Sequence, residues 1–164
     1  MLFRSPACAG RINAVFGPWE RDTGLRDTLS PLLQLAAFAR EGREAVLARD
    51  GVRDWVYAPD VADAFVAMLE APDLPPEPMN ISMDRLWNLD VMARALAGSP
   101  LRLRWRYAAE GEATNLRYGF PLKPPRRALS NARIGARLAW KPAHGPEEAC
   151  ADYVRWLQSP SGTN

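Results

Sequence analysis

Short apolar runs alternate with segments of helical periodicity along the chain. Residues 11–16 (RINAVF) predict a short buried strand that Gly17-Pro18 closes. Ser30 followed by Pro31 predicts the start of a helix, because a hydroxyl N-cap and a proline at the first helical position both favour one. Gly42 stands where a glycine commonly ends such a helix.

The same periodicities predict the remaining elements. From Asp60 to about Glu70, apolar residues at i, i+4, i+7 and i+8 predict a second helix. Further helices are expected from an Asn88 cap to Gly98, from a Ser130 cap to Leu138, and from residue 145 to about Leu157. Strands are expected at 44–48, 53–57, 79–82 and 101–107.

The sequence does not determine how two of these strands pair. Residues 44–48 and 53–57 flank Asp50-Gly51, a strong turn signal, so they form either a hairpin or two strands in separate places. With no internal repeat, the alternation of strands and helices predicts an α/β fold, and 164 residues suffice for one domain with a core.

Composition indicates an ordinary globular chain. The hydrophobic fraction is 48%, the charged fraction 24% and the net charge +2, too small to indicate nucleic acid or an anionic membrane as a partner. Of the 21 basic residues only Lys123 and Lys141 are lysine, which reflects either GC-rich codons or recognition of anions by guanidinium groups. An RNA-binding role for the arginines of 101–107 is the weaker interpretation, since no RNA-binding signature accompanies them.

The sequence lacks the residue patterns that several kinds of active site require. Cys8 and Cys150 make neither a metal spacing nor a disulfide framework, and His144, the only histidine, is expected to be a solvated loop residue beside a Gly-Pro turn. There is no Gly-x-Gly, and no tyrosine is followed by lysine four residues later. With no signal peptide and no apolar run of about 20 residues, we expect a cytoplasmic protein that does not enter a membrane.

Four strings resemble the C-terminal half of extended short-chain dehydrogenase/reductases, the NAD-dependent epimerase/dehydratase family. RINAVFGP (11–18) is similar to the family's R-x-x-N-x-Y-G-P strand, and VRDWVYAPDVADAF (52–65) to its R-D-[FWY]-[VI]-x-V-x-D-[VL]-A-x-A segment. MNISMDRLWNLDVMARAL (79–96) resembles a Y-N-[IL]-G strand with the helix after it, and RRALSNARIGARLAWKP (126–142) the late stretch ending L-G-W-x-P. Together they cover nearly the whole chain from about residue 10, in consistent order.

The resemblance implies a fold and its boundaries. The expected fold is the C-terminal part of a Rossmann-type domain, with the last strands of its parallel sheet and the small α/β substrate-binding subdomain. The implied domain spans 11–158, after a poorly defined N-terminal stub (1–10) and before a disordered tail (159–164).

The resemblance also implies a substrate site. Arg53 matches the arginine that contacts the nucleotide diphosphate, although it could instead be a structural arginine paired with Asp54 or Asp63. Ala14 stands where many members have a substrate-binding Asn, so that contact is lost or supplied by Asn13, and Asn80 is either near the substrate or a satisfied strand-end amide. Further substrate-binding candidates are Val46 beside the base and the rim residues Trp19, Arg26 and Asp27. In place of the family's phosphate-binding arginine the sequence offers Arg127, with Lys123 and Arg126 as alternatives, or else a solvated basic loop.

For the cofactor, the resemblance implies NAD or NADP in the intact family enzyme, with Ile12 and Val15 lining its nicotinamide end. The family's glycine-rich loop and catalytic Tyr-x-x-x-Lys would lie upstream of residue 11, so we expect no catalytic residue, no bound cofactor and no activity in this chain alone. The implied function is the substrate-binding portion of a nucleotide-sugar epimerase, dehydratase or related oxidoreductase; the alternative is a non-catalytic ligand-binding or interaction remnant. Uncovered strands would also make oligomerisation possible.

Overall fold

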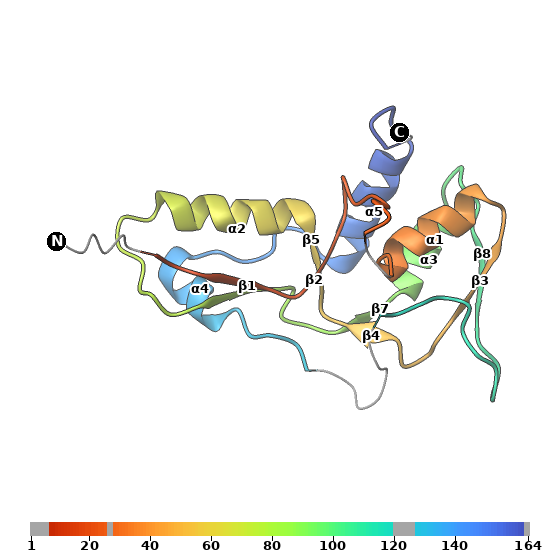
Figure 1. The fold of residues 1–164 in the computed structure, drawn as a ribbon, viewed down its shortest axis with the longest axis horizontal. Helices are drawn as coiled ribbons and strands as arrows, with labels where there is room; N and C mark the ends of the chain where they lie inside the picture. The colour runs from red at the N-terminus through yellow and green to blue at the C-terminus, as the bar shows by residue number, and fades with distance from the viewer. Residues whose placement is uncertain (1–6, 26–27, 120–126, 163–164) are drawn as a thin grey trace.

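The computed structural model describes residues 7–25, 28–119 and 127–162. Eight short strands and five helices alternate along these residues (Figure 1). The strands are β1 (Gly10–Ile12), β2 (Ala14–Phe16), β3 (Glu44–Leu47), β4 (Val52–Arg53), β5 (Trp55–Tyr57), β6 (Met79–Ile81), β7 (Trp87–Asn88) and β8 (Arg104–Tyr107). The helices are α1 (Pro31–Arg40), α2 (Ala58–Glu70), α3 (Asp90–Ala97), α4 (Ala132–Leu138) and α5 (Pro146–Leu157).

The strands pair over long distances in the sequence. β1 pairs with β6, β2 with β5 and β3 with β8, each in parallel, and β4 pairs with β7 in antiparallel. The strands on either side of Asp50-Gly51 therefore form no hairpin with each other: β3 is paired with β8, and β4 and β5 have other partners. The α/β class expected from the sequence is confirmed.

Two apolar clusters hold the elements together. The smaller lies where α2 and α4 meet β5 and β6, around Val56, Ala64 and Ile134. The larger gathers buried residues of α1, α3 and α5 with those of β2, β3 and β5, including Phe16, Leu35 and Tyr153. In Figure 1, α2, β1, β6 and α4 occupy one end of an elongated molecule, and α1, α3, β3 and β8 the other.

Three local predictions need correction. Asn88 does not cap α3, which begins at Asp90; it lies in β7 and its amide donates to the carbonyl of Arg49 (2.9 Å). Asn131, not Ser130, is the N-cap residue of α4. The strand predicted at 101–107 begins only at Arg104, because the main chain turns at 99–102 and Arg102 takes a left-handed conformation (φ 47°).

The end of the described chain is bonded to the fold. Arg40 donates to the carbonyl oxygens of Leu157 (3.2 Å) and Gly162 (2.7 Å), and Gly162 is buried. Residues 159–162, which the sequence analysis assigns to a disordered tail, thus form a turn against α1 and α5; residues 163–164 lie outside the described residues.

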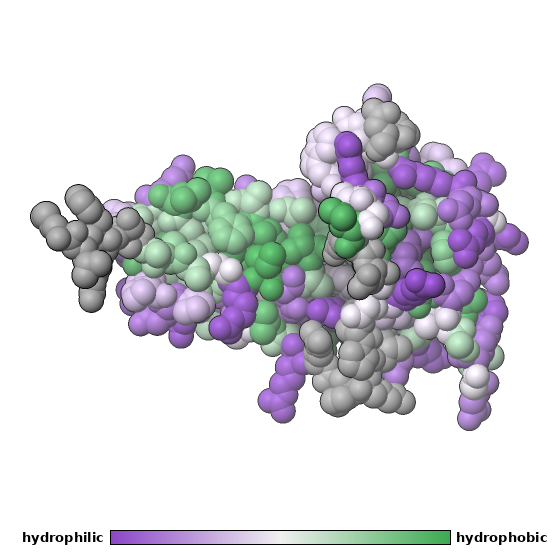
Figure 2. Space-filling view, viewed as in Figure 1, coloured by the Kyte–Doolittle hydropathy of each residue, from purple (hydrophilic) through white to green (hydrophobic). Residues whose placement is uncertain are grey.

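An apolar surface remains exposed along α2. Phe65, Val66 and Leu69 are 38%, 50% and 85% exposed, and Ile12 of β1 is 48% exposed. Figure 2 shows apolar residues gathered along α2 and over the strands beside it. No helix in the described part of the chain is both long enough and apolar enough to cross a membrane.

Candidate functional site

A cavity of about 560 Å³ lies along β2 and the loop that follows it, within the size range of small-molecule sites. Its walls come from β1 and β2, from the loop that follows, from the start of α1, and from β4, β5 and the chain near residue 118. The lining residues are Ile12, Asn13, Ala14, Val15, Phe16, Gly17, Pro18, Trp19, Glu20, Thr28, Leu29, Ser30, Pro31, Arg53, Trp55, Ala58, Tyr118 and Gly119.

The turn that forms the cavity depends on Gly17. Its φ of 137° lies in a region that residues with a side chain avoid. A Cβ at this position would also lie 2.9 Å from the ring of Tyr57, which is fully buried. Only glycine therefore lets the chain leave β2 in this direction, and Pro18 and Trp19 are directed across the cavity mouth as a consequence.

Glu20 joins this loop to the start of α1. Its carboxylate accepts hydrogen bonds from the Ser30 hydroxyl (2.6 Å) and the Ser30 main-chain N–H (3.1 Å). The Ser30 Oγ in turn accepts from the N–H of Leu33 (3.1 Å), so the predicted N-cap is confirmed. The Ser-Pro pair marks Ser30 in the sequence, whereas nothing near Glu20 indicates a bond to a residue ten positions away.

Arg53 enters the cavity from β4, and the next residue holds that segment in place. The Arg53 guanidinium carbon lies 5.9 Å from the centroid of the Trp55 ring. Asp54 is fully buried, and its two carboxylate oxygens accept from the N–H groups of Met83 (2.8 Å) and Leu129 (2.9 Å). Asp54 therefore joins three distant segments behind the cavity wall.

Tyr118 forms the far wall of the cavity and also faces the Asp50-Gly51 turn. Its hydroxyl accepts from the N–H of Ala48 (3.1 Å). A Cβ on Gly51 would meet the Tyr118 ring at 2.7 Å, so this glycine is required by close packing. Burial raises the pKa of Tyr118 above its ordinary value, which keeps the phenol neutral beside the cavity.

The structure brings six of the predicted site residues to this one cavity: Ile12, Asn13, Ala14, Val15, Trp19 and Arg53.

Asn80 and Arg127 lie outside the lining of this cavity. The Asn80 amide donates to the carbonyl of Ser130 (2.9 Å), which matches the strand-end alternative, and Arg127 is exposed. Arg26, Asp27, Lys123 and Arg126 fall outside the described residues, and Glu20, Ser30 and Tyr118 are lining residues that the sequence analysis did not select.

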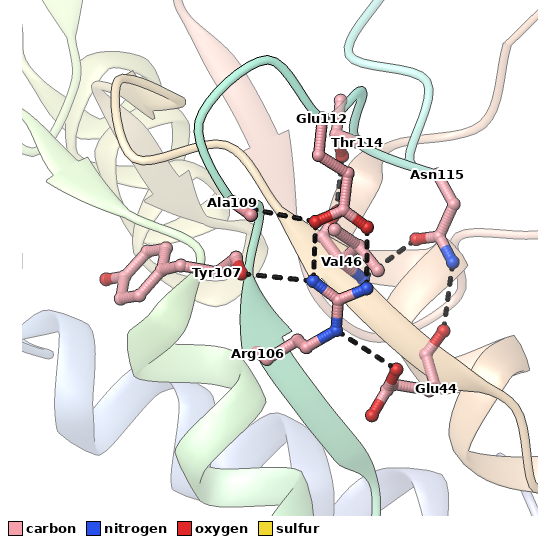
Figure 3. Close-up of polar contacts among 8 residues, drawn as sticks. All are labelled: Glu44, Val46, Arg106, Tyr107, Ala109, Glu112, Thr114 and Asn115. Carbon is pink, nitrogen blue, oxygen red and sulfur yellow. Dashed lines mark hydrogen bonds and ion pairs between the residues drawn. The ribbon is translucent and has the colours of Figure 1, made fainter.

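Val46 lies on β3, away from the cavity, and its main chain is already bonded (Figure 3). The Asn115 side chain accepts from the Val46 N–H (2.8 Å) and donates to the Glu44 carbonyl (2.9 Å), while the Thr114 hydroxyl donates to the Val46 carbonyl. The side chains of 114–115 thus cover the strand edge that the sequence analysis assigns to a nucleotide base.

The loop that carries Asn115 is closed by an arginine–carboxylate pair. Arg106 donates through both terminal nitrogens to Glu112 (2.6 Å each) and through Nε to Glu44 (3.3 Å) (Figure 3). The bonds from Arg106 lower the pKa of Glu112 to about 2. A second cavity of about 720 Å³ lies at this loop, lined by residues 48–50 and 108–114, and it contains none of the predicted site residues.

Titratable side chains also meet where the end of β5 and the start of α2 bond to α5 and to the loop before it, outside the cavity lining. His144, expected to be solvated, instead places Nδ1 2.7 Å from Oδ1 of buried Asp60, a residue that no sequence signal marks as its partner. The Tyr57 hydroxyl donates to Asp152 (2.5 Å); burial and this bond raise the pKa of Tyr57, and the same bond lowers the pKa of Asp152. Because each group already has a partner within the fold, this cluster is a structural junction.

The fit to a nicotinamide cofactor is partial. Ile12 and Val15 offer an apolar wall to the cavity, as the resemblance implies for the nicotinamide end. The sequence contains no Gly-x-Gly that could bring the main chain against a pyrophosphate. The described residues contain no group of three or more His, Cys, Asp or Glu side chains able to hold a metal ion.

Comparison with known proteins gives the wider relationship. Residues 2–82, just under half of the chain, match the family model described as "NAD dependent epimerase/dehydratase family". A search of curated proteins finds no significant match. The solved structures show a likeness of fold alone, because they are less than 25% identical to this chain.

Three of these structures illustrate the likeness. The Bordetella bronchiseptica enzyme WbmG in complex with NAD and UDP is 14% identical, with a TM-score of 0.66 over 97% of this chain and 46% of its own. The Thermotoga maritima UDP-glucose 4-epimerase with UDP-glucose is 21% identical, with a TM-score of 0.63 over 91% and 45%. The Bacillus anthracis dTDP-glucose 4,6-dehydratase with NAD is 18% identical, with a TM-score of 0.60 over 91% and 43%. The chain thus spans less than half the length of the structures it matches.

Proposed function

We propose that this chain, a relative of the NAD-dependent nucleotide-sugar epimerases and dehydratases, supplies the substrate-binding side of such an enzyme. Its cavity holds a nucleotide-activated sugar and presents the sugar to a nicotinamide. A cofactor-binding unit outside these 164 residues then carries the hydride and proton transfers. The relatives solved with NAD, UDP or UDP-glucose support this class of ligand.

One observation carries the proposal. Residues selected on family resemblance alone, Arg53 and the stretch that includes Asn13 and Trp19, line a single cavity although some 35 to 40 positions separate them. Parallel pairing of β2 with β5 brings Asn13 beside the segment of Arg53, because Ala14 is in register with Trp55. Trp19 reaches the same cavity from the loop that follows β2. The fold therefore supports one ligand site with contributions from both segments.

The lining suits a phosphorylated ligand. The guanidinium of Arg53 can form paired hydrogen bonds to phosphate oxygens, which are stronger than bonds between neutral groups. Asp54 holds the main chain beside Arg53 through Met83 and Leu129, so the charge is presented from a fixed segment. At Ala14 the wall has no hydrogen-bonding side chain, so the amide of Asn13 takes that role next to the sugar.

Removal of the Arg53 charge tests the proposal. We expect isothermal titration calorimetry to detect UDP-glucose or dTDP-glucose binding by the wild-type chain, and Arg53→Ala to weaken it about tenfold or more, since a hydrogen bond to a charged group contributes roughly 1.5–3 kcal/mol. Arg137→Ala is the matched control, because Arg137 is exposed on α4 and does not line the cavity. Equal affinities of the Arg53 and Arg137 variants would remove Arg53 from the site.

A second function is favoured by one feature of the sequence. The 164 residues contain neither a Gly-x-Gly nor a Tyr-x-x-x-Lys, so the chain could use its cavity for ligand binding without any hydride transfer. The two functions differ in their response to a cofactor-binding unit of the same family supplied in trans. The substrate-binding role predicts nucleotide-sugar conversion with NAD in the mixture, whereas the binding-only role predicts unchanged sugar.

A further inference from the structure

Trp19 combines three features that folding alone does not explain. Its indole lines the cavity and is 63% exposed, whereas the indole of Trp55 in the same lining is 2% exposed. Its φ of 71° lies in the left-handed region, which glycine and asparagine adopt readily and which a bulky residue adopts only under strain. Strained, exposed side chains of this kind concentrate at ligand sites.

The indole is nevertheless held in position. It makes an edge-to-face contact with Trp156 of α5, at 5.6 Å between ring centroids and 63° between planes. Trp156 stacks on the fully buried Tyr153 (5.9 Å, 21°), and Tyr153 contacts Phe16 at the end of β2 (6.0 Å). A row of rings therefore connects the exposed indole with the core, and the guanidinium carbon of Arg21 lies over the indole, 5.6 Å from the ring centroid.

Other residues of the cavity lining offer charged and hydrogen-bonding groups. Glu20 and Ser30 form a hydrogen-bonded pair on the wall that follows Trp19, and Arg53 lies on the strand side. A pyranose ring has C–H groups on its faces and hydroxyls around its edge. The negative face of an indole attracts polarised C–H groups, while a carboxylate and a hydroxyl can bind the sugar hydroxyls.

We propose that Trp19 is the platform on which the sugar ring of the ligand stacks, so that it determines the preference for a nucleotide sugar over the bare nucleotide. This inference rests on the proposed function and deepens it. Arg53 binds the diphosphate common to both ligands, whereas Trp19 contacts only the part that differs. The strained backbone is retained because it places the indole over the mouth of the cavity and not in the core.

The test compares affinities for UDP-glucose and UDP in wild type and Trp19→Gly by calorimetry. Glycine adopts φ 71° without strain, so we expect Trp19→Gly to fold with a melting temperature at or above that of the wild type. We expect its UDP-glucose affinity to fall about tenfold with its UDP affinity unchanged. Trp19→Asn, which also tolerates this conformation, is expected to give the same loss and serves if the glycine variant does not fold.

Ala139→Gly is the matched control. Ala139 also has a positive φ (52°) and is exposed after α4, away from the cavity, so this change relieves similar backbone strain and is expected to leave both affinities unchanged. An unchanged ratio of UDP-glucose to UDP affinity in the Trp19 variants, with a lowered melting temperature, would identify Trp19 as a packing residue and overturn the inference. If the wild type binds neither ligand, the proposed function itself fails.

Discussion

Asp54 shows at the residue scale how a single side chain can support the whole site. It is fully buried, lies next to Arg53, and joins β4 and β5 to Met83 and Leu129 through two main-chain N–H groups. Both carboxylate oxygens of Asp54 accept a hydrogen bond. An asparagine at this position has only one acceptor oxygen, so one of the two main-chain N–H groups would lose its partner. Such a loss costs about 1–3 kcal/mol.

We therefore predict that Asp54→Asn lowers the free energy of unfolding by about 1–3 kcal/mol, measured by urea denaturation. The control is Asp63→Asn, at an exposed position on α2, which is expected to change stability by less than about 0.5 kcal/mol. Equal stability of the two variants would show that the Asp54 bonds do not hold this segment.

The sequence indicated some site residues and missed others for a physical reason. Asn13 and Arg53 lie in strings with local signatures, a strand closed by Gly-Pro and an Arg-Asp-aromatic segment, and Trp19 directly follows the first of these strings, so their place could be predicted. Glu20 and Tyr118 reach the cavity through bonds to Ser30 and Ala48, over separations of 10 and 70 residues. No local pattern encodes such contacts.

At the scale of elements, helices were easier to predict than strand pairs. The α1 helix begins at its Ser-Pro signal and α2 follows its apolar periodicity, because both depend on neighbouring residues. The pairing of β3 with β8 joins residues about 60 positions apart. The Asp50-Gly51 turn left a hairpin and two separate strands as alternatives, and the structure has separate strands. Strand partners are chosen by tertiary packing, which the local sequence does not specify.

The surface of α2 leads to a prediction about association. Phe65, Val66 and Leu69 are exposed beside β1, and within the described part of the chain β1 pairs only with β6. An exposed apolar helix face next to a strand with an unused edge favours association. We expect the isolated chain to self-associate, as the sequence analysis also anticipates.

Substitution on this face should weaken the association. We expect Leu69→Lys to reduce self-association about tenfold in analytical ultracentrifugation without loss of thermal stability, because burial of a leucine contributes roughly 1.5–3 kcal/mol. Leu25→Lys changes an equally exposed leucine outside α2, at 89% against 85%, and should leave association unchanged. A wild-type chain that stays monomeric at high concentration would exclude this role for α2.

At the scale of the whole molecule, the fold brings two of the four segments of family resemblance, 11–18 and 52–65, to one cavity. The α/β class and the likeness to part of an extended Rossmann-type enzyme could be predicted from the sequence, since four ordered strings span most of the chain. The four small sheets, the buried partner of His144 and the covered edge of β3 at Val46 could not, because each depends on residues brought together only by folding. The proposed binding site for the nucleotide sugar is the 560 Å³ cavity, and not the larger cavity at 108–114.

Amide chemical-shift mapping distinguishes the two cavities, because it locates a ligand without a mutation in either one. The Leu69→Lys variant is suited to it, since an 18.2 kDa chain with reduced self-association gives sharp signals. Titration with UDP-glucose should move the amide signals of residues 13–17, 19 and 20 and of Arg53, together with the indole N–H of Trp19, and leave residues 108–114 unchanged. Shifts confined to residues 108–114, or no shifts at saturating ligand, would contradict the account.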